Sequence, residues 1–301
     1  MSQSPEPRSN GAGASELRAC PVCQSALVPG LEPWHWLCKQ CGYEKAELQP
    51  TINARSSHKL IDEGDREKGL RDLRVLNFRT LLDEIRREKP SGRLLDVGCA
   101  HGWFLETARS DYEVVGIEPD EDICKATQGR GLPVRQGFFP EVLAEGERFD
   151  VIVFNDVLEH IPDIQGVLAA CRERLHGGGL LVLNLPSSRG SFYRLSKALR
   201  RLGVRSHFDR LWQKGLPSPH LHYVNPQNLS TLIRNSGFDP VREGILSTLR
   251  LSGLYTRVSY TGGHGVVVRV AIYLCLVLAL PILKVLPSDI IYIVARRQAS
   301  S

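Results

Sequence analysis

The first 18 residues lack the apolar core of a signal peptide and are instead polar, with many Ser, Pro and Gly residues. This composition predicts a disordered tail, residues 1–18, on a cytoplasmic protein. The eight cysteines are then expected in a reducing compartment, where disulfides rarely form. The chain has 301 residues, 42% of them hydrophobic, which is enough to bury a sizeable core in one large domain or two unequal ones.

A complete dinucleotide-binding fingerprint is also missing. Residues 94–102 read as a buried strand that runs into a glycine turn, where Gly98 and Gly102 let the backbone turn sharply and approach a ligand. A nicotinamide or flavin site would need a third small residue where Trp103 stands. The absence disfavours those cofactors and favours a different adenosyl ligand.

The next predicted strand, 113–118, ends in Glu118, about 20 residues after Gly98, where a carboxylate can accept both ribose hydroxyls. Together with Asp96 and Gly102, these residues resemble the first motif of the class I S-adenosylmethionine-dependent methyltransferases. Ala100 replaces the middle glycine of that motif. It is small enough to admit the cofactor but removes the freedom for positive φ that glycine would provide.

The resemblance implies an α/β fold, with a doubly wound, seven-stranded and mostly parallel sheet in a methyltransferase domain over residues 91–297. Residues 46–90 before it are expected to form a linker and a charged covering helix, 65–88. The expected strands are 94–97, 113–118, 133–136, 149–154, 180–185, one from 238 onward, and an antiparallel one at 290–295.

The resemblance also implies further residues that contact S-adenosylmethionine. These are Cys99 and Ala100 in the glycine turn, Phe138 beside the adenine, and Asn155 near the methionine end of the cofactor. Phe138 could equally belong to the core, and Cys99 has the character of a small buried apolar residue.

Three histidines are candidate catalytic bases. His160 lies in a segment, 150–163, that resembles the fourth motif of quinone-biosynthesis O-methyltransferases, with Leu-Glu-His before a proline. Its imidazole could take the proton from an acceptor hydroxyl, or it could pack beneath the cofactor loop. His220 and His222, in the segment 219–223, are the other candidates.

Four cysteines form two Cys-x2-Cys pairs, Cys20 with Cys23 and Cys38 with Cys41, separated by 14 residues. A segment this short cannot hold itself together by core burial alone, so this spacing predicts a structural zinc ribbon over residues 19–45. A redox or iron site is the alternative. Four thiolates leave no open coordination position, which argues against catalysis by the metal.

Two predicted inserts, 189–214 and 247–286, leave the sheet from the edge that would hold the cofactor. The first carries eight Lys or Arg residues and one acid, and its pattern is that of a basic amphipathic helix. A solvated helix packed on the domain is the alternative. The apolar face would consist of Phe192, Leu195, Leu199 and Leu202, and the basic face of Arg194, Lys197, Arg201 and Arg205.

The second insert contains an apolar run, 270–283, which Pro281 is expected to break. Fourteen helical residues reach only about 21 Å, short of a hydrocarbon core near 30 Å. We expect this segment to lie in a membrane interface, so that the protein is peripheral at the inner face of the membrane. A spanning helix and a buried core helix are the alternatives.

The leading functional interpretation is an enzyme that transfers the methyl group of S-adenosylmethionine to an oxygen or carbon of a lipid, a quinone, or a lipid-linked or nucleotide sugar. RNA methylation is an alternative, because a zinc ribbon and a basic patch suit phosphate backbones. The sequence lacks the Asn/Asp-Pro-Pro-aromatic run used on exocyclic base nitrogens, which disfavours nucleic acid. A non-catalytic adaptor is disfavoured by the intact Asp96, Gly98 and Glu118.

Overall fold

The computed structural model describes residues 19–51, 63–249, 254, 255, 258 and 265–299. The expected disordered tail, 1–18, lies outside the described residues. So do part of the expected linker, 52–62, and parts of the second insert between 250 and 264.

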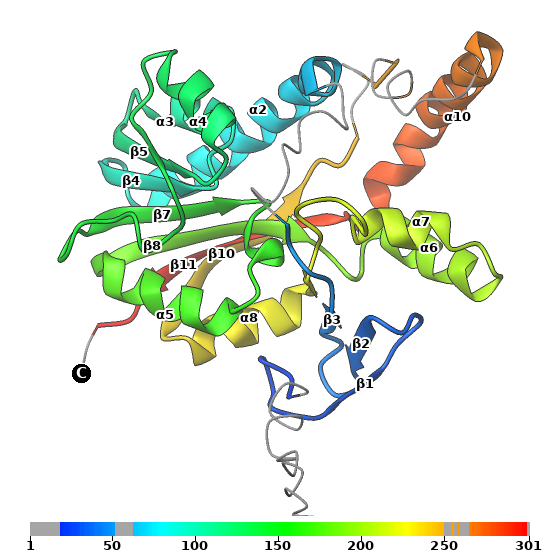
Figure 1. The fold of residues 1–301 in the computed structure, drawn as a ribbon, viewed down its shortest axis with the longest axis horizontal. Helices are drawn as coiled ribbons and strands as arrows, with labels where there is room; N and C mark the ends of the chain where they lie inside the picture. Colours follow the sequence, from blue (N-terminus) through cyan, green and yellow to red (C-terminus); the bar gives the residue numbers. More distant parts are fainter. Residues whose placement is uncertain (1–18, 52–62, 250–253, 256–257, 259–264, 300–301) are drawn as a thin grey trace, which may run out of the picture.

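In the described part of the chain, seven strands form one sheet in the order β10-β11-β8-β7-β4-β5-β6 (Figure 1). β4 pairs in parallel with β5 and β7, whereas β11 runs antiparallel to both β8 and β10. The predicted doubly wound sheet is therefore confirmed. The strands are β4 (Gly92–Val97), β5 (Tyr112–Glu118), β6 (Val134–Gln136), β7 (Phe149–Asn155), β8 (Leu175–Pro186), β10 (Phe238–Leu246) and β11 (Ile290–Arg297).

Helices cover both faces of this sheet (Figure 1). Successive residues of a strand point to opposite faces, so Leu95 and Val97 of β4 belong to one buried cluster and Leu94 to the other. This two-sided burial explains why the central strands are apolar almost throughout. One face carries α2 (Glu63–Glu88), α3 (Trp103–Ala108) and α4 (Glu121–Gln128), and the other carries α5 (Ile164–Arg174) and α8 (Pro226–Asn235).

The cysteine-rich segment forms three short antiparallel strands, β1 (Leu27–Pro29), β2 (His35–Cys38) and β3 (Glu44–Ala46). A fourth strand in this small sheet, β9 (His222–Tyr223), comes from the methyltransferase domain and pairs with β3. Tyr43 is also part of the same buried cluster as the central strands. The segment is thus joined to the domain by a shared sheet and a shared core.

The first insert forms α6 (Ser191–Arg201) and α7 (Ser206–Leu211). The predicted basic face of α6 is only partly free, because Lys197 donates to the Glu44 carboxylate of β3 at 2.6 Å. The predicted apolar face is divided, because Leu195 and Leu202 are 54% and 80% exposed whereas Phe192 and Leu199 are partly buried. This helix is attached to the cysteine-rich segment by polar contacts and by the buried cluster that Tyr193 shares with Ala46, and it leaves Leu195 at the surface.

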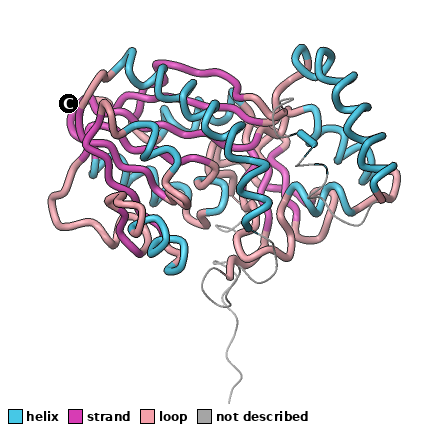
Figure 2. Tube along the Cα trace, turned by 90° about the horizontal axis from the view of Figure 1, so that it is seen from above, coloured by secondary structure: helices cyan, strands magenta, loops and turns pink. Residues whose placement is uncertain are grey.

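The second insert contains α10 (Val266–Val285), which projects away from the sheet in Figure 1. The helix continues through Pro281, so the expected break is absent there, although proline removes one backbone hydrogen bond. Seen from above in Figure 2, the seven-stranded sheet lies in one half of the molecule and the helices of the inserts lie in the other. Within the described ranges, no helix has the combination of length and apolarity needed to cross a bilayer.

Candidate active site

The turn after β4 has the backbone geometry of a ligand cradle. Gly98, Ala100 and Gly102 have φ of 69°, 44° and 68°. A Cβ at Gly98 would lie 2.7 Å from Val157 Cγ2, so a side chain there would have no room. A Cβ added at Gly102 would lie 2.5 Å from Leu132 Cδ1, so a side chain has no room at this position either.

Ala100 adopts the positive φ that its side chain disfavours, contrary to what its residue type suggested. Two hydrogen bonds to the Ala100 main chain offset the cost of this backbone conformation. The Ala100 N–H donates to the Glu118 carboxylate at 2.9 Å, and the Thr127 hydroxyl donates to the Ala100 carbonyl at 3.0 Å. Neighbouring elements therefore fix this turn from both sides.

Glu118, the last residue of β5, is the buried carboxylate that organises this edge of the sheet. Besides Ala100, it accepts a hydrogen bond from the Asp120 N–H at 2.9 Å. Two backbone donors hold the carboxylate in one orientation, and Glu118 also lines the cavity next to the turn. This position agrees with a role in gripping ribose hydroxyls.

A chain of side-chain hydrogen bonds extends from this edge into the sheet. Asn184 donates to Asn155 at 2.7 Å, and Asn155 donates to the Asp96 carboxylate at 3.1 Å. Burial raises the pKa of Asp96 to about 8, and the nearby charge of Glu118 adds to the rise. A bound cation would restore the charged form of Asp96, so the site suits a positively charged ligand such as S-adenosylmethionine.

Asp96, Glu118 and Asn155 line a cavity of about 1180 Å³. Cys99 and Phe138 also line it, and Phe138 is 53% exposed, which places it at the cavity surface and not in the core. The donor and acceptor groups, the glycine cradle and the buried acid fit the adenosyl cofactor that the sequence predicts.

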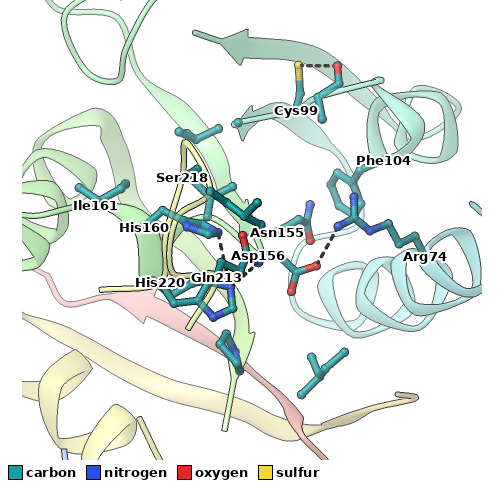
Figure 3. Close-up of a pocket in the computed structure, with 18 of the residues that line it drawn as sticks. Arg74, Cys99, Phe104, Asn155, Asp156, His160, Ile161, Gln213, Ser218 and His220 are labelled. Carbon is teal, nitrogen blue, oxygen red and sulfur yellow. Dashed lines mark hydrogen bonds and ion pairs between the residues drawn. The ribbon is translucent and has the colours of Figure 1, made fainter. Parts of the chain in front are cut away.

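The cavity continues past the cofactor half to a cluster of polar side chains (Figure 3). The short 3₁₀ helix η2 (Leu158–His160) delivers Glu159 and His160, and the loop before β9 delivers His220. The ring centroids of the two histidines are 4.8 Å apart. One Glu159 carboxylate oxygen lies 4.0 Å from the Nε2 atom of each imidazole.

The protonation states in this cluster follow from burial. Burial lowers the pKa of His160, and it lowers the pKa of His220 to about 3, so both imidazoles are neutral at physiological pH. Burial also raises the pKa of Glu159 well above its ordinary value. His160 Nδ1–H donates to the Pro219 carbonyl at 2.9 Å, which leaves its Nε2 atom as a proton acceptor.

His222 is separated from this pair. It is buried beneath the cavity wall and is not among the residues that line the cavity. Its Nε2–H donates to the Ile161 carbonyl at 2.8 Å, and its Nδ1 atom accepts the Tyr43 hydroxyl. Both ring nitrogens are therefore occupied, and we retain only His160 and His220 as candidate bases.

Sequence reasoning left several cavity residues unassigned. Glu159 lies inside the Leu-Glu-His motif, and its position next to the candidate base was the available signal. Arg74, from α2, lies 3.9 Å from the Asp156 carboxylate at this edge, but nothing in its local sequence marks it.

Glu159, His160 and His220 each offer a ligand atom, all within 4.8 Å of one another, so this set could also hold a metal ion.

The four cysteines of the paired motif meet at one point, although they come from opposite ends of their segment. Their sulfur atoms all lie within 4.8 Å of one another, with Cys20 and Cys41 3.5 Å apart and Cys23 and Cys38 3.4 Å apart. A tetrahedral zinc site with bonds of about 2.3 Å has sulfur atoms roughly 3.8 Å apart. The arrangement therefore fits a four-thiolate metal site.

A family model described as a methyltransferase domain matches residues 68–243. The chain belongs to the S-adenosylmethionine-dependent methyltransferases. The match begins in α2 and includes the cradle, both motif acids and the histidine pair, whereas Pro50, Leu276 and Ile290 of the cavity lining lie outside it.

Among curated proteins, this methyltransferase is similar to the ubiquinone biosynthesis O-methyltransferase of Cereibacter sphaeroides strain KD131. The two are 32% identical over 162 residues, which cover 51% of this chain and 63% of that relative. The protein of the same description from Roseobacter denitrificans is 31% identical over 181 residues, covering 56% and 71% of the two chains.

Solved structures share the fold of this methyltransferase at low identity. A possible histamine N-methyltransferase from Thermotoga maritima superimposes with a TM-score of 0.53 and 16% identity, covering 80% of this chain and 97% of that one. The magnesium protoporphyrin IX methyltransferase of Synechocystis, solved with bound SAH, gives a TM-score of 0.50 and 13% identity, with coverages of 77% and 87%.

Replacing Glu118 with Ala should weaken binding of S-adenosylhomocysteine, the demethylated cofactor, because the variant loses the ribose acceptor and the support of Ala100. A charged hydrogen bond contributes about 1.5–3 kcal/mol, so the dissociation constant should rise roughly 10- to 100-fold by calorimetry. Glu113→Ala, on the same strand but with a side chain 73% exposed, is the control and should bind normally. Unchanged binding by Glu118→Ala would contradict the assignment.

Proposed function

We propose that this methyltransferase transfers the methyl group of S-adenosylmethionine to a hydroxyl oxygen of a quinone-type aromatic acceptor. The observation that carries the proposal is His160, a neutral imidazole whose Nε2 atom lies in the same cavity as the cofactor cradle. The curated relatives named for ubiquinone O-methylation support an acceptor of this class.

The cofactor would supply an already activated methyl group, so the protein's task is mainly positioning. Glu118, Asp96 and Asn155 would hold the cofactor half of the cavity. His160 would accept the hydroxyl proton on Nε2, while its Nδ1–H bond to the Pro219 carbonyl keeps the ring in the required tautomer.

The far wall of the cavity suits an apolar substituent on the acceptor. Phe192, Leu211 and Leu216 line it, and so does Leu276 of α10. On that same helix, Leu274 and Leu278 are exposed. The cavity therefore opens beside an apolar surface, as a hydrophobic acceptor would require.

The same contacts weaken the RNA alternative. Lys197 and Arg200 of the basic insert are paired with the buried Glu44 and Glu32 of the cysteine-rich segment. Two of the cations that suggested a phosphate-binding patch are thus committed to internal ion pairs.

The proposed base gives a pH-dependent prediction. With a water-soluble catechol as the acceptor probe, His160→Gln should reduce kcat by roughly 10²- to 10⁴-fold, because glutamine cannot accept the proton. Since burial holds the pKa of His160 below its ordinary 6.5, wild-type kcat should stay high down to pH 6.5 and decline only at more acid pH. His207→Gln, at an exposed position on α7, is the control. An undiminished rate in His160→Gln would exclude this base.

We further propose that the four thiolates hold a structural zinc ion. Metal analysis of the purified protein should find about one zinc per chain, which Cys38→Ser with Cys41→Ser should abolish. Cys275→Ser, at an exposed position on α10, should leave the metal content unchanged. The cofactor cradle contains no ligand to this site, so S-adenosylhomocysteine should still bind the double variant. Finding iron, or no metal, would overturn the zinc assignment.

We also propose that the cavity mouth faces the cytoplasmic surface of a membrane, with α10 and the outward leucines of α6 in the interface. Binding to anionic vesicles should have a salt-sensitive part from the basic insert and a salt-resistant part from apolar burial. Replacing both Leu274 and Leu278 with Asp should remove the salt-resistant part without changing cofactor affinity. Ile245→Asp, which charges an exposed apolar position on β10, is the control. Wild-type protein that ignores vesicles at low salt would refute the proposal.

A further inference from the structure

The cysteine-rich segment is hydrogen-bonded directly to the wall of the acceptor half of the cavity. β3 pairs with β9, with Lys45 opposite His222 and Glu44 opposite Tyr223. Just before β9, the Leu221 carbonyl accepts a hydrogen bond from the Ala46 N–H at 2.9 Å. His220, which directly precedes these contacts, and Tyr223, which makes one of them, line the cavity.

A buried side-chain relay reinforces this pairing. The Tyr43 hydroxyl donates to His222 Nδ1, and His222 Nε2–H donates to the Ile161 carbonyl directly after η2. The carbonyl can only accept, so the proton of neutral His222 must be on Nε2, and Nδ1 must be the acceptor for Tyr43. Tyr43 and His222 are 0% and 2% exposed, so water cannot replace a lost partner without entering the core.

The opposite side of the wall is bound to η2. The Leu221 N–H donates to the Glu159 carbonyl at 2.7 Å, and His160 Nδ1–H donates to the Pro219 carbonyl. The wall segment, residues 217–223, therefore lies between the cysteine-rich segment and the helix that carries the proposed base. A displacement of this segment would change the positions of both histidines.

The backbone of the cysteine pairs continues these contacts. The Cys38 N–H donates to the Tyr43 carbonyl at 2.8 Å. The Cys41 carbonyl accepts hydrogen bonds from the side chains of Asn225 and Asn228, at 3.1 and 3.3 Å. The two residues that would bind metal through sulfur thus hold, through their main chain, both Tyr43 and the chain just after β9.

We propose that Tyr43 is a positioning residue for the acceptor half of the active site, and that the folded cysteine-rich segment sets the placement of His160 and His220 through Tyr43 and His222. The expected effect on catalysis rests on the proposed function. The placement of His160 and His220 does not, because it depends only on contacts within this protein. The cofactor half is held differently, by Glu118 and the turn after β4, and does not depend on the relay.

The test compares Tyr43→Phe with Tyr112→Phe. Both remove one hydroxyl from a buried tyrosine, but that of Tyr112 donates to the Lys89 carbonyl, far from the relay. Imidazole ¹⁵N NMR spectra, assigned with His160→Gln and His220→Gln, should show shifted His160 and His220 signals only in Tyr43→Phe. Affinity for S-adenosylhomocysteine should be unchanged in both.

With the catechol probe, Tyr43→Phe should lower kcat by about 10- to 100-fold, as expected when a reacting group is displaced by roughly 1 Å. His222→Gln should keep the wild-type His160 and His220 signals, because its amide can accept from Tyr43 and donate to Ile161. His222→Leu can do neither, so its spectrum should resemble that of Tyr43→Phe. Removing the metal from the wild type with a chelator should shift the same two histidine signals.

Two results would overturn the proposal. One is that the His160 and His220 signals in Tyr43→Phe match those in Tyr112→Phe. The other is that Tyr43→Phe loses affinity for S-adenosylhomocysteine to the same extent as it loses kcat. The spectra need no acceptor, so they decide the placement even if the catechol is not methylated. Absence of methylation by the wild type would count against the proposed acceptor class alone.

Discussion

Parallel strands that share one sheet direct their carboxyl ends to one edge, and that constraint creates this active site. β4, β5, β7 and β8 end there in Val97, Glu118, Asn155 and Pro186, and the turns that follow them converge on a single cavity. The hydrogen bonds of Glu118 join the turns of two strands, and the Asn184–Asn155–Asp96 chain joins three. The cofactor half is thus built into the sheet itself.

The same convergence concentrates acidic groups in a region of low dielectric. Asp96 and Glu159 are buried and Asp156 is half-buried, and desolvation raises the pKa of all three carboxyl groups. The histidines nearby show the opposite response, with lowered pKa values. Burial therefore produces a largely neutral site that gains from a cationic cofactor in one half and from a proton-accepting imidazole in the other.

Most of the sheet could be predicted from the sequence because its signals are local. Apolar runs mark the strands, and glycine at 98 and an acid at 118 mark the edge. The contacts that were missed depend on distant partners. β9 has two residues and no periodicity of its own, the positive φ of Ala100 depends on Glu118 and Thr127, and the outward leucines of α6 follow from ion pairs with Glu44 and Glu32. His222 was proposed as a base from its neighbours in sequence, whereas its place is decided by Tyr43.

The pairing of β3 with β9 also sets an order of assembly during synthesis. β1, β2 and β3 leave the ribosome early, but the strand that completes their sheet lies in the second half of the methyltransferase domain. Until it emerges, the edge of β3 carries unpaired backbone groups of the kind that recruit other chains. Metal captured early by the cysteines would hold that edge in a small, preformed unit, ready to receive His222 and Tyr223 when the domain closes around it.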